Sequence, residues 1–287
     1  MLQAMDRVVL AAADARCGRV WERLLGAEPA GSSVHPALGA RAHRWRLGNG
    51  WLEILVPDGD GIVGYALEAR GPHLFAGGFT TADLGAFARH LDDIGIEPLW
   101  DGKRLVLDET ASGIPGLRLL VDAHRPQPAV GLIDRFYELT DLVADADRET
   151  ARAAEVLGLD AAAFEPIASD TYGYRGSLTL FDPARLDRLE IITPESPGTT
   201  MRRFFDRNGS GLYMAFAETG NLVEIERRAR GSGLGHTSDP APGQRDSLGP
   251  HTVFLHPKTL GGMMLGLSRR SYAWTWSGHP ERVEVAP

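Results

Sequence analysis

Two adjacent stretches decide the fold: Phe136–Ala144 (FYELTDLVA) and Arg148–Gly158 (RETARAAEVLG). The first is rich in apolar and aromatic residues, which predicts a short strand. The second has apolar residues at helical spacing and ends at Gly158, a common stop signal for helices. We therefore interpret residues 136–158 as the beginning of a strand–helix unit that later strands complete.

The same order recurs four times along the chain, and each strand–helix pair is followed by further strands. The turn Gly48-Asn49-Gly50 marks a hairpin in the first unit. The predicted strands are Met5–Ala12, Arg41–Leu47, Trp51–Val56, Leu74–Thr81, Arg104–Leu107, Leu117–Val121, Phe136–Ala144, Ser177–Phe181, Leu189–Thr193, Tyr213–Glu218, Thr252–His256 and Met263–Leu267. The predicted helices are Ala15–Gly26, Ala82–Gly95, Arg148–Gly158, Thr200–Arg207 and Asn221–Ala229. Four βαβββ-like units, two in each half, predict an α+β fold.

The halves of the chain are separated by Pro126-Gln127-Pro128, a typical boundary composition. This boundary predicts an N-terminal domain at residues 1–126 and a C-terminal domain at residues 129–287. The segment Arg230–Pro250 is rich in Gly, Pro and Ser, and it predicts a mobile surface loop.

Composition and charge exclude several classes of protein. The chain has 287 residues, of which 43% are hydrophobic, as in globular proteins. Its 30 Lys and Arg against 38 Asp and Glu give a formal net charge of −8, which disfavours nucleic acid as a partner. Asp14 and Arg16 interrupt the apolar N-terminal run, so we expect neither a signal peptide nor a membrane span. The single cysteine, Cys17, excludes an intramolecular disulfide. These features predict a soluble, cytoplasmic protein.

Three stretches resemble the vicinal oxygen chelate superfamily, which includes glyoxalases, methylmalonyl-CoA epimerases and extradiol dioxygenases. Phe254–Leu267 (FLHPKTLGGMMLGL) is similar to the FLHPK-x-x-GG-x-x-x-EL ending of methylmalonyl-CoA epimerases. Ile191–Phe216 resembles the stretch of that family that ends in a GLHHIAF strand, and His35–Pro57 resembles the HPxxGTxN…LGxxYLELL pattern of glyoxalase-like domains. The resemblance covers nearly the whole chain. It implies two fused glyoxalase-like domains whose curved mixed sheets surround a pocket.

The resemblance also implies where a divalent metal would be held, by side chains from the first and last strands of paired units. Carried over one at a time, the first-strand positions are Arg7, Ala76, Glu138 and Tyr213. The last-strand positions are Glu53, Leu120 (approximately), Glu190 and Gly266.

Most of these positions depart from the family pattern. A guanidinium cannot ligate a metal, so Arg7 and Glu53 predict a structural salt bridge in place of a metal, and a structural N-terminal domain. In the second half, the two-His, one-carboxylate set of the extradiol dioxygenases should fall on Glu138, Tyr213 and Gly266. None of the three matches, which disfavours an extradiol dioxygenase.

The leading interpretation is an isomerase, epimerase or lyase that needs no catalytic metal or other cofactor. If Glu138 and Glu190 share a pocket, they cannot both ionise cheaply, so the pair becomes a proton donor and acceptor near neutral pH. This chemistry suits proton transfer at a carbon next to a carbonyl, in a small carbonyl, aromatic or acyl substrate. Tyr213 would then donate a hydrogen bond to the developing oxyanion.

Two alternatives remain open. The protein is a non-catalytic binding or sequestering protein if the carboxylates are merely paired with arginines such as Arg135 or Arg175. It is a metal-dependent glyoxalase- or epimerase-type enzyme if Glu138 and Glu190 hold a divalent metal with His236 or His251.

Further candidates for substrate binding lie near the C-terminus. Trp274 and Trp276 alternate along a predicted strand, so they share one sheet face that either roofs an aromatic or acyl pocket or packs internally. Arg269 either meets a substrate carboxylate or phosphate or lies solvated at the surface. His256, in the FLHPK stretch, is not a metal ligand in the family and is assigned here as a hydrogen-bonded histidine beside the substrate. Because four units can close their own pockets, we expect a monomer, or a homodimer formed through other surfaces.

Overall fold

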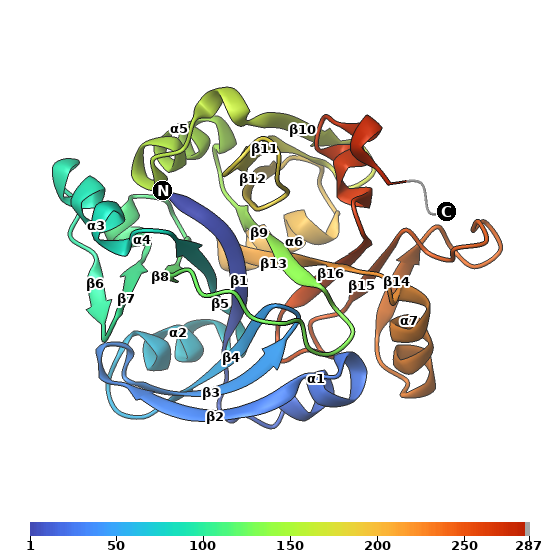
Figure 1. Ribbon diagram of the computed structural model, residues 1–287, viewed down its shortest axis with the longest axis horizontal. Coiled ribbons are helices and arrows are strands. Elements are labelled where there is room, and N and C mark those ends of the chain that lie inside the picture. Colours follow the sequence, from blue (N-terminus) through green and yellow to red (C-terminus); the bar gives the residue numbers. More distant parts are fainter. Residues whose placement is uncertain (285–287) are drawn as a thin grey trace. The chain divides into compact units, whose positions relative to one another are not determined.

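The computed structural model describes residues 1–284, which form two eight-stranded sheets (Figure 1). The first sheet has the order β2-β3-β4-β1-β5-β8-β7-β6. Its strands are β1 (Leu2–Ala11), β2 (Glu28–His35), β3 (Ala40–Leu47), β4 (Gly50–Pro57), β5 (His73–Thr81), β6 (Leu99–Asp101), β7 (Arg104–Leu107) and β8 (Leu119–Ala123).

The second sheet repeats this order as β10-β11-β12-β9-β13-β16-β15-β14. Its strands are β9 (Arg135–Leu142), β10 (Glu165–Ser169), β11 (Tyr174–Leu180), β12 (Arg188–Pro194), β13 (Gly211–Thr219), β14 (His236–Asp239), β15 (Thr252–Leu255) and β16 (Met264–Arg269). The α-helices are α1 (Gly18–Leu25), α2 (Ile62–Arg70), α3 (Leu84–Asp93), α4 (Glu109–Ser112), α5 (Ala146–Leu157), α6 (Thr200–Asn208) and α7 (Leu222–Gly231). Short 3₁₀ turns are η1 (Pro36–Leu38), η2 (Ala161–Ala163), η3 (Tyr272–Trp276) and η4 (Pro280–Arg282).

Each quarter of the chain is one βαβββ unit whose first and last strands pair in parallel. These parallel pairs are β1 with β4, β5 with β8, β9 with β12, and β13 with β16. The remaining two strands of each unit add in antiparallel order, as in β10-β11-β12. The predicted α+β class, with tandem βαβββ units and curved mixed sheets, is therefore confirmed.

Local signals set both ends of α5, the helix that follows the first strand of the third repeat. Asp145 caps α5 by accepting a hydrogen bond from the Arg148 amide, and Gly158 ends the helix at a φ of 61°. Ala153, Val156 and Leu157 of this helix are fully buried, and α5 packs against β11 and β12. This packing fixes β12 beside β9, the strand pair on which the candidate site lies.

Contacts divide the chain into two compact units. One comprises Met1–Met5, Ala76–Arg125 and Glu138–Tyr213. The other comprises Asp6–Phe75, Pro126–Tyr137 and the chain from Met214 onward. Each unit thus contains one βαβββ repeat from each half of the sequence. The boundary at residues 126–129 between two functional domains stays a prediction.

The sequence did not predict the outermost strand of any repeat, which is β2, β6, β10 or β14. No residue of β2, β10 or β14 is fully buried, and two of the three residues of β6 are exposed. A strand exposed on both faces lacks the apolar alternation by which strands are recognised. The predicted loop Arg230–Pro250 was wrong in part for the same reason, because it contains β14.

No helix in residues 1–284 is long and apolar enough to cross a membrane.

Candidate active site

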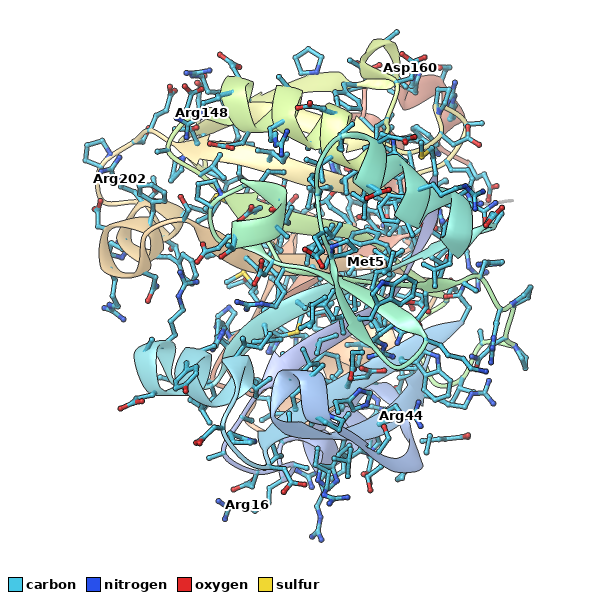
Figure 2. The ribbon with its side chains drawn as sticks, turned by 90° about the vertical axis from the view of Figure 1, so that its left-hand side faces the viewer. Met5, Arg16, Arg44, Arg148, Asp160 and Arg202 are labelled. Carbon is cyan, nitrogen blue, oxygen red and sulfur yellow. The ribbon has the colours of Figure 1, made fainter. Side chains whose placement is uncertain are left out.

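The register between β9 and β12 brings four polar side chains together. Glu138 lies opposite Arg188, and Thr140 lies opposite Glu190. Residues two apart on a strand point to the same face, so all four side chains share one face of this strand pair. In Figure 2, the labelled Arg148 marks α5, which packs on β12. The candidate site is therefore built by neighbouring strands of a single compact unit.

The four side chains form one buried ion pair and one short hydrogen bond. Arg188 donates from Nε to Oε2 of Glu138 over 2.6 Å, and the Nη2 atom of this ion pair lies 2.5 Å from the same oxygen. The Thr140 hydroxyl donates to Oε2 of Glu190 over 2.5 Å. Arg188 and Glu138 are 0% and 1% exposed, whereas Glu190 retains 5% of its surface. Glu190 is thus the more accessible carboxyl of the two.

Burial raises the pKa values of both carboxyls, and their charged neighbours modify the two shifts differently. Burial, together with the negative charge of Glu138, raises the pKa of Glu190 to about 8, although the Thr140 hydrogen bond opposes this shift. Burial also raises the pKa of Glu138, and the Arg188 guanidinium offsets part of that rise. One guanidinium compensates only one of two carboxylates, so the site favours a single negative charge on the pair of carboxyls.

A tyrosine that sequence reasoning missed lies in the field of both carboxyls. Tyr174 shares a face of β11 with Leu178, which is the register partner of Glu190. Burial and the charges of Glu190 and Glu138 raise the pKa of Tyr174, so its phenol keeps its proton. The signal was present in the sequence as alternation along residues 174–180, but the predicted strand began only at Ser177.

Tyr213 lies on β13 in different surroundings. Its ring packs edge-on against Phe204 of α6, with ring centroids 5.1 Å apart, and burial raises its pKa to about 12. Within residues 1–284, no hydrogen bond joins Tyr213 to Glu138 or to Glu190. The N-cap positions explain the difference: Asn221 precedes α7 seven residues after Met214, whereas Asp145 caps α5 seven residues after Glu138. By this count the equivalent of Glu138 is Met214, and Tyr213 points to the opposite face.

The positions that the sequence resemblance implies for a divalent metal do not fit one here. Glu138 is bound by Arg188, and the predicted partners Arg7 and Glu53 are joined by an ion pair of 2.9 Å. Gly266 has no side chain, and a Cβ at that position would lie 2.3 Å from the Phe216 ring. Among the described residues, no group of three His, Cys, Asp or Glu side chains could hold a metal ion. At these implied positions Glu138 is neutralised by Arg188, Arg7 and Glu53 neutralise each other, and the Phe216 ring occupies the space beside Gly266.

The fit of Phe216 against Gly266 gives a prediction. We expect Gly266→Ala to lower the free energy of unfolding by about 1–3 kcal/mol, because Phe216 is packed against Phe254 and Trp276 and cannot move aside freely. Urea unfolding measures the loss. Adding Phe216→Leu should restore part of it, and an unchanged stability of Gly266→Ala would show that the ring does not fill this position.

The histidines and arginines proposed as partners of the carboxyls have other contacts. His236 donates from Nδ1 to the Leu234 carbonyl over 2.9 Å. His251 lies 2.8 Å from the Tyr272 hydroxyl. Arg135 pairs with Glu218, and Arg175 pairs with Glu195 and Asp147. An arginine does pair with Glu138, but it is Arg188, which the predicted strand boundary at Leu189 left out.

The C-terminal candidates form part of the packing of the other compact unit. The predicted strand through Trp274 and Trp276 is wrong, because these residues lie on η3, where alternation does not place them on one sheet face. Trp276 packs against Phe216 with centroids 6.1 Å apart, and Arg282 stacks over Trp274. A predicted surface or ligand-binding arginine, Arg269, pairs with Asp246 over 3.0 Å.

His256 lies after β15 and is partly exposed. Its Nε2 is 3.5 Å from the Thr237 hydroxyl, and its backbone amide donates to the Gly235 carbonyl. Burial and the neighbouring His236 lower the pKa of His256. A neutral, hydrogen-bonded histidine agrees with the structural half of its assignment, while contact with a substrate stays a prediction.

Comparison with known proteins gives matches only among solved structures. No family model and no curated protein matches the sequence. A triple mutant of 4-hydroxymandelate synthase from Streptomyces coelicolor matches 93% of this chain and 92% of its own, at 15% identity and a TM-score of 0.67. A xylose isomerase-like TIM barrel/4-hydroxyphenylpyruvate dioxygenase fusion protein matches 94% of this chain at 13% identity and a TM-score of 0.64. This chain spans 49% of the fusion protein.

Methylmalonyl-CoA epimerase from Mycobacterium tuberculosis matches 48% of this chain and 89% of its own, at 23% identity and a TM-score of 0.39. That score adds nothing to the fold assignment. The two longer matches agree with the four βαβββ repeats and with the two equivalent sheets. The chain has the vicinal oxygen chelate fold in its two-domain form, as the sequence predicts.

Proposed function

We propose that the protein is an isomerase or lyase that transfers a proton at the carbon next to a carbonyl of a small acyl or aromatic substrate. The observation that carries the proposal is Glu190, a nearly buried carboxyl whose pKa is raised to about 8. A general acid or base is most effective when its pKa lies near the working pH. Glu190 is therefore poised to give up or accept a proton at neutral pH.

The surrounding groups support this role. Glu138 and Arg188 form a fixed ion pair, so the negative charge beside Glu190 stays in place when its proton leaves. Thr140 holds the Glu190 carboxyl by a hydrogen bond and fixes its orientation. We assign Glu190 as the proton carrier and Glu138 as the carboxylate that sets its pKa.

The oxyanion that forms on the substrate needs a hydrogen-bond donor. Tyr174 is a protonated phenol in the field of both carboxyls, and we assign this role to Tyr174 rather than Tyr213. Because the metal positions of the fold do not fit a metal in this chain, no step of the proposed reaction is routed through one.

Exchange of a substrate hydrogen for deuterium tests the proposal without knowledge of the product. Acyl thioesters, 2-oxo acids and aromatic ketones are incubated with the protein in heavy water, and loss of the proton signal next to the carbonyl is followed by NMR. We expect exchange on at least one class, and Glu190→Gln should slow it by about 100-fold. The amide keeps the shape of the side chain but cannot carry the proton.

The matched control is Glu224→Gln, which removes a half-buried carboxylate on α7 that pairs with Arg227 and Arg228. It should leave the exchange rate unchanged. Equal rates in the folded Glu190→Gln variant and the wild type would overturn the assignment of Glu190.

A second function, binding without conversion, is favoured by one observation. The Glu138–Arg188 pair is fully buried and satisfies its own charges, as structural ion pairs do. Stoichiometric binding of an aromatic or acyl compound, with no deuterium exchange and no effect of Glu190→Gln, would assign this function instead.

A further inference from the structure

A second cluster of charged groups lies on the first sheet, in the compact unit that the proposed reaction does not use. Arg44 and Arg46 are two residues apart on β3, so they project from the same face. Their register partners on β4 are Glu53 and Trp51. Figure 2 labels Arg44 on the blue strands of this sheet.

Both arginines have a buried donor without an acceptor. The Nε–H groups of Arg44 and Arg46 are buried, and neither has a hydrogen-bond partner in residues 1–284. Arg46 donates from Nη2 to the Pro128 carbonyl over 2.7 Å, and the Arg44 guanidinium lies 5.7 Å from the centre of the Trp51 ring. A buried, unsatisfied donor is costly, so two on one face indicate a missing acceptor.

The nearby acidic groups do not compensate these two charges. Glu53 and Asp6 are both bound to Arg7, over 2.9 Å and 2.8 Å. Glu28 lies opposite Arg46 on β2 but is exposed, and no ion pair joins the two in the described chain. In residues 1–284, therefore, no ion pair joins the guanidinium of Arg44 or of Arg46 to a carboxylate.

The nature of the missing acceptor follows from its neighbours. A guanidinium matches the planar geometry of a carboxylate, and an aromatic ring beside it offers an apolar surface for the rest of the ligand. The net charge of −8 works against polyanions. We infer that Arg44, Arg46 and Trp51 form a second binding site, which takes a small monocarboxylate with a flat apolar group.

Calorimetric titration with benzoate, in a buffer free of other carboxylates, tests this site. Wild-type protein should bind benzoate with a Kd of about 10 mM or below. Arg44→Gln combined with Arg46→Gln should weaken binding about tenfold or more, because each arginine supplies a charge-assisted hydrogen bond. Trp51→Leu should reduce the preference for benzoate over acetate.

The matched control combines Arg41→Gln and Arg19→Gln, which remove the same charge from the same unit. Arg41 pairs with Asp58 at the surface, and Arg19 lies on α1. This control should bind benzoate as the wild type does. Three results would overturn the inference: no binding by the wild type, equal weakening in the control, or tighter binding of inorganic phosphate than of benzoate. A melting temperature for each variant confirms that it is folded.

Discussion

Arg188→Met lowers the free energy of unfolding by about 3–5 kcal/mol in urea titrations at pH 7. The guanidinium is the partner of Glu138 in a buried ion pair. Both side chains are at most 1% exposed, so water does not solvate their charges. Removing the cation leaves a buried carboxylate whose charge nothing compensates. The chain can relieve this cost only by protonating Glu138 or by opening the strand pair.

A double variant separates the pair from its surroundings. Arg188→Met with Glu138→Gln removes both charges, so most of the lost stability should return. Arg175→Met, which breaks an exposed pair with Glu195 and Asp147, should cost less than about 1 kcal/mol. A double variant as unstable as Arg188→Met alone would mean that lost packing, and not an unpaired charge, causes the effect.

The stability of the wild type falls as pH rises from about 4.5 to about 8, through the titration of Glu190. Its pKa is about 8 in the folded chain and 4.5 in the unfolded chain, so the folded state holds a proton that the unfolded state has lost. Protonation at low pH therefore stabilises the fold, and each pH unit across this window removes about 1.4 kcal/mol. Above pH 8 both states are ionised and the loss is complete.

Glu190→Gln isolates this contribution because an amide does not titrate. Relative to wild type, the variant should gain stability progressively between pH 5 and pH 8, by several kcal/mol at the upper end. Urea unfolding of both proteins at a series of pH values measures the difference. Glu224, whose pKa is lowered to about 2 by hydrogen bonds from Arg227 and Arg228, serves as the control. A flat difference for Glu190→Gln, like that expected for Glu224→Gln, would mean that Glu190 is ionised in the fold.

The order of the four βαβββ repeats could be predicted from local sequence signals. The central strands and helices carry strong apolar patterns, and residues such as Asp145 and Gly158 mark helix ends. The outer strands were missed because hydrogen bonds to one neighbour hold them, and such bonds leave no trace in apolar periodicity. The segment Ser271–Gly278 shows the reverse error, since alternation along three aromatic residues imitates a strand on a 3₁₀ turn.

The site was predictable as far as it depended on counting along single strands. Counting from a helix cap finds Glu138, and the acidic residue of the last strand finds Glu190. Arg188 lies outside the predicted strand and meets Glu138 only through register, which is a property of paired strands. Tyr174 was missed because the predicted strand began at Ser177, although the alternation extends to residue 174. One misplaced residue in that count reverses a side chain, and the positions of the helix caps make Met214, one residue after Tyr213, the equivalent of Glu138.

The unpaired backbone N–H and C=O groups of an edge strand can form hydrogen bonds with a strand from another chain. The edges of both sheets are poor templates for this growth. β6 and β14 have 3 and 4 residues, and the pairing of β2 is interrupted between Pro29 and Ser32. Pro166 deprives β10 of one amide donor. Native protein at high concentration therefore resists fibril growth from the outer strands that residues 1–284 form.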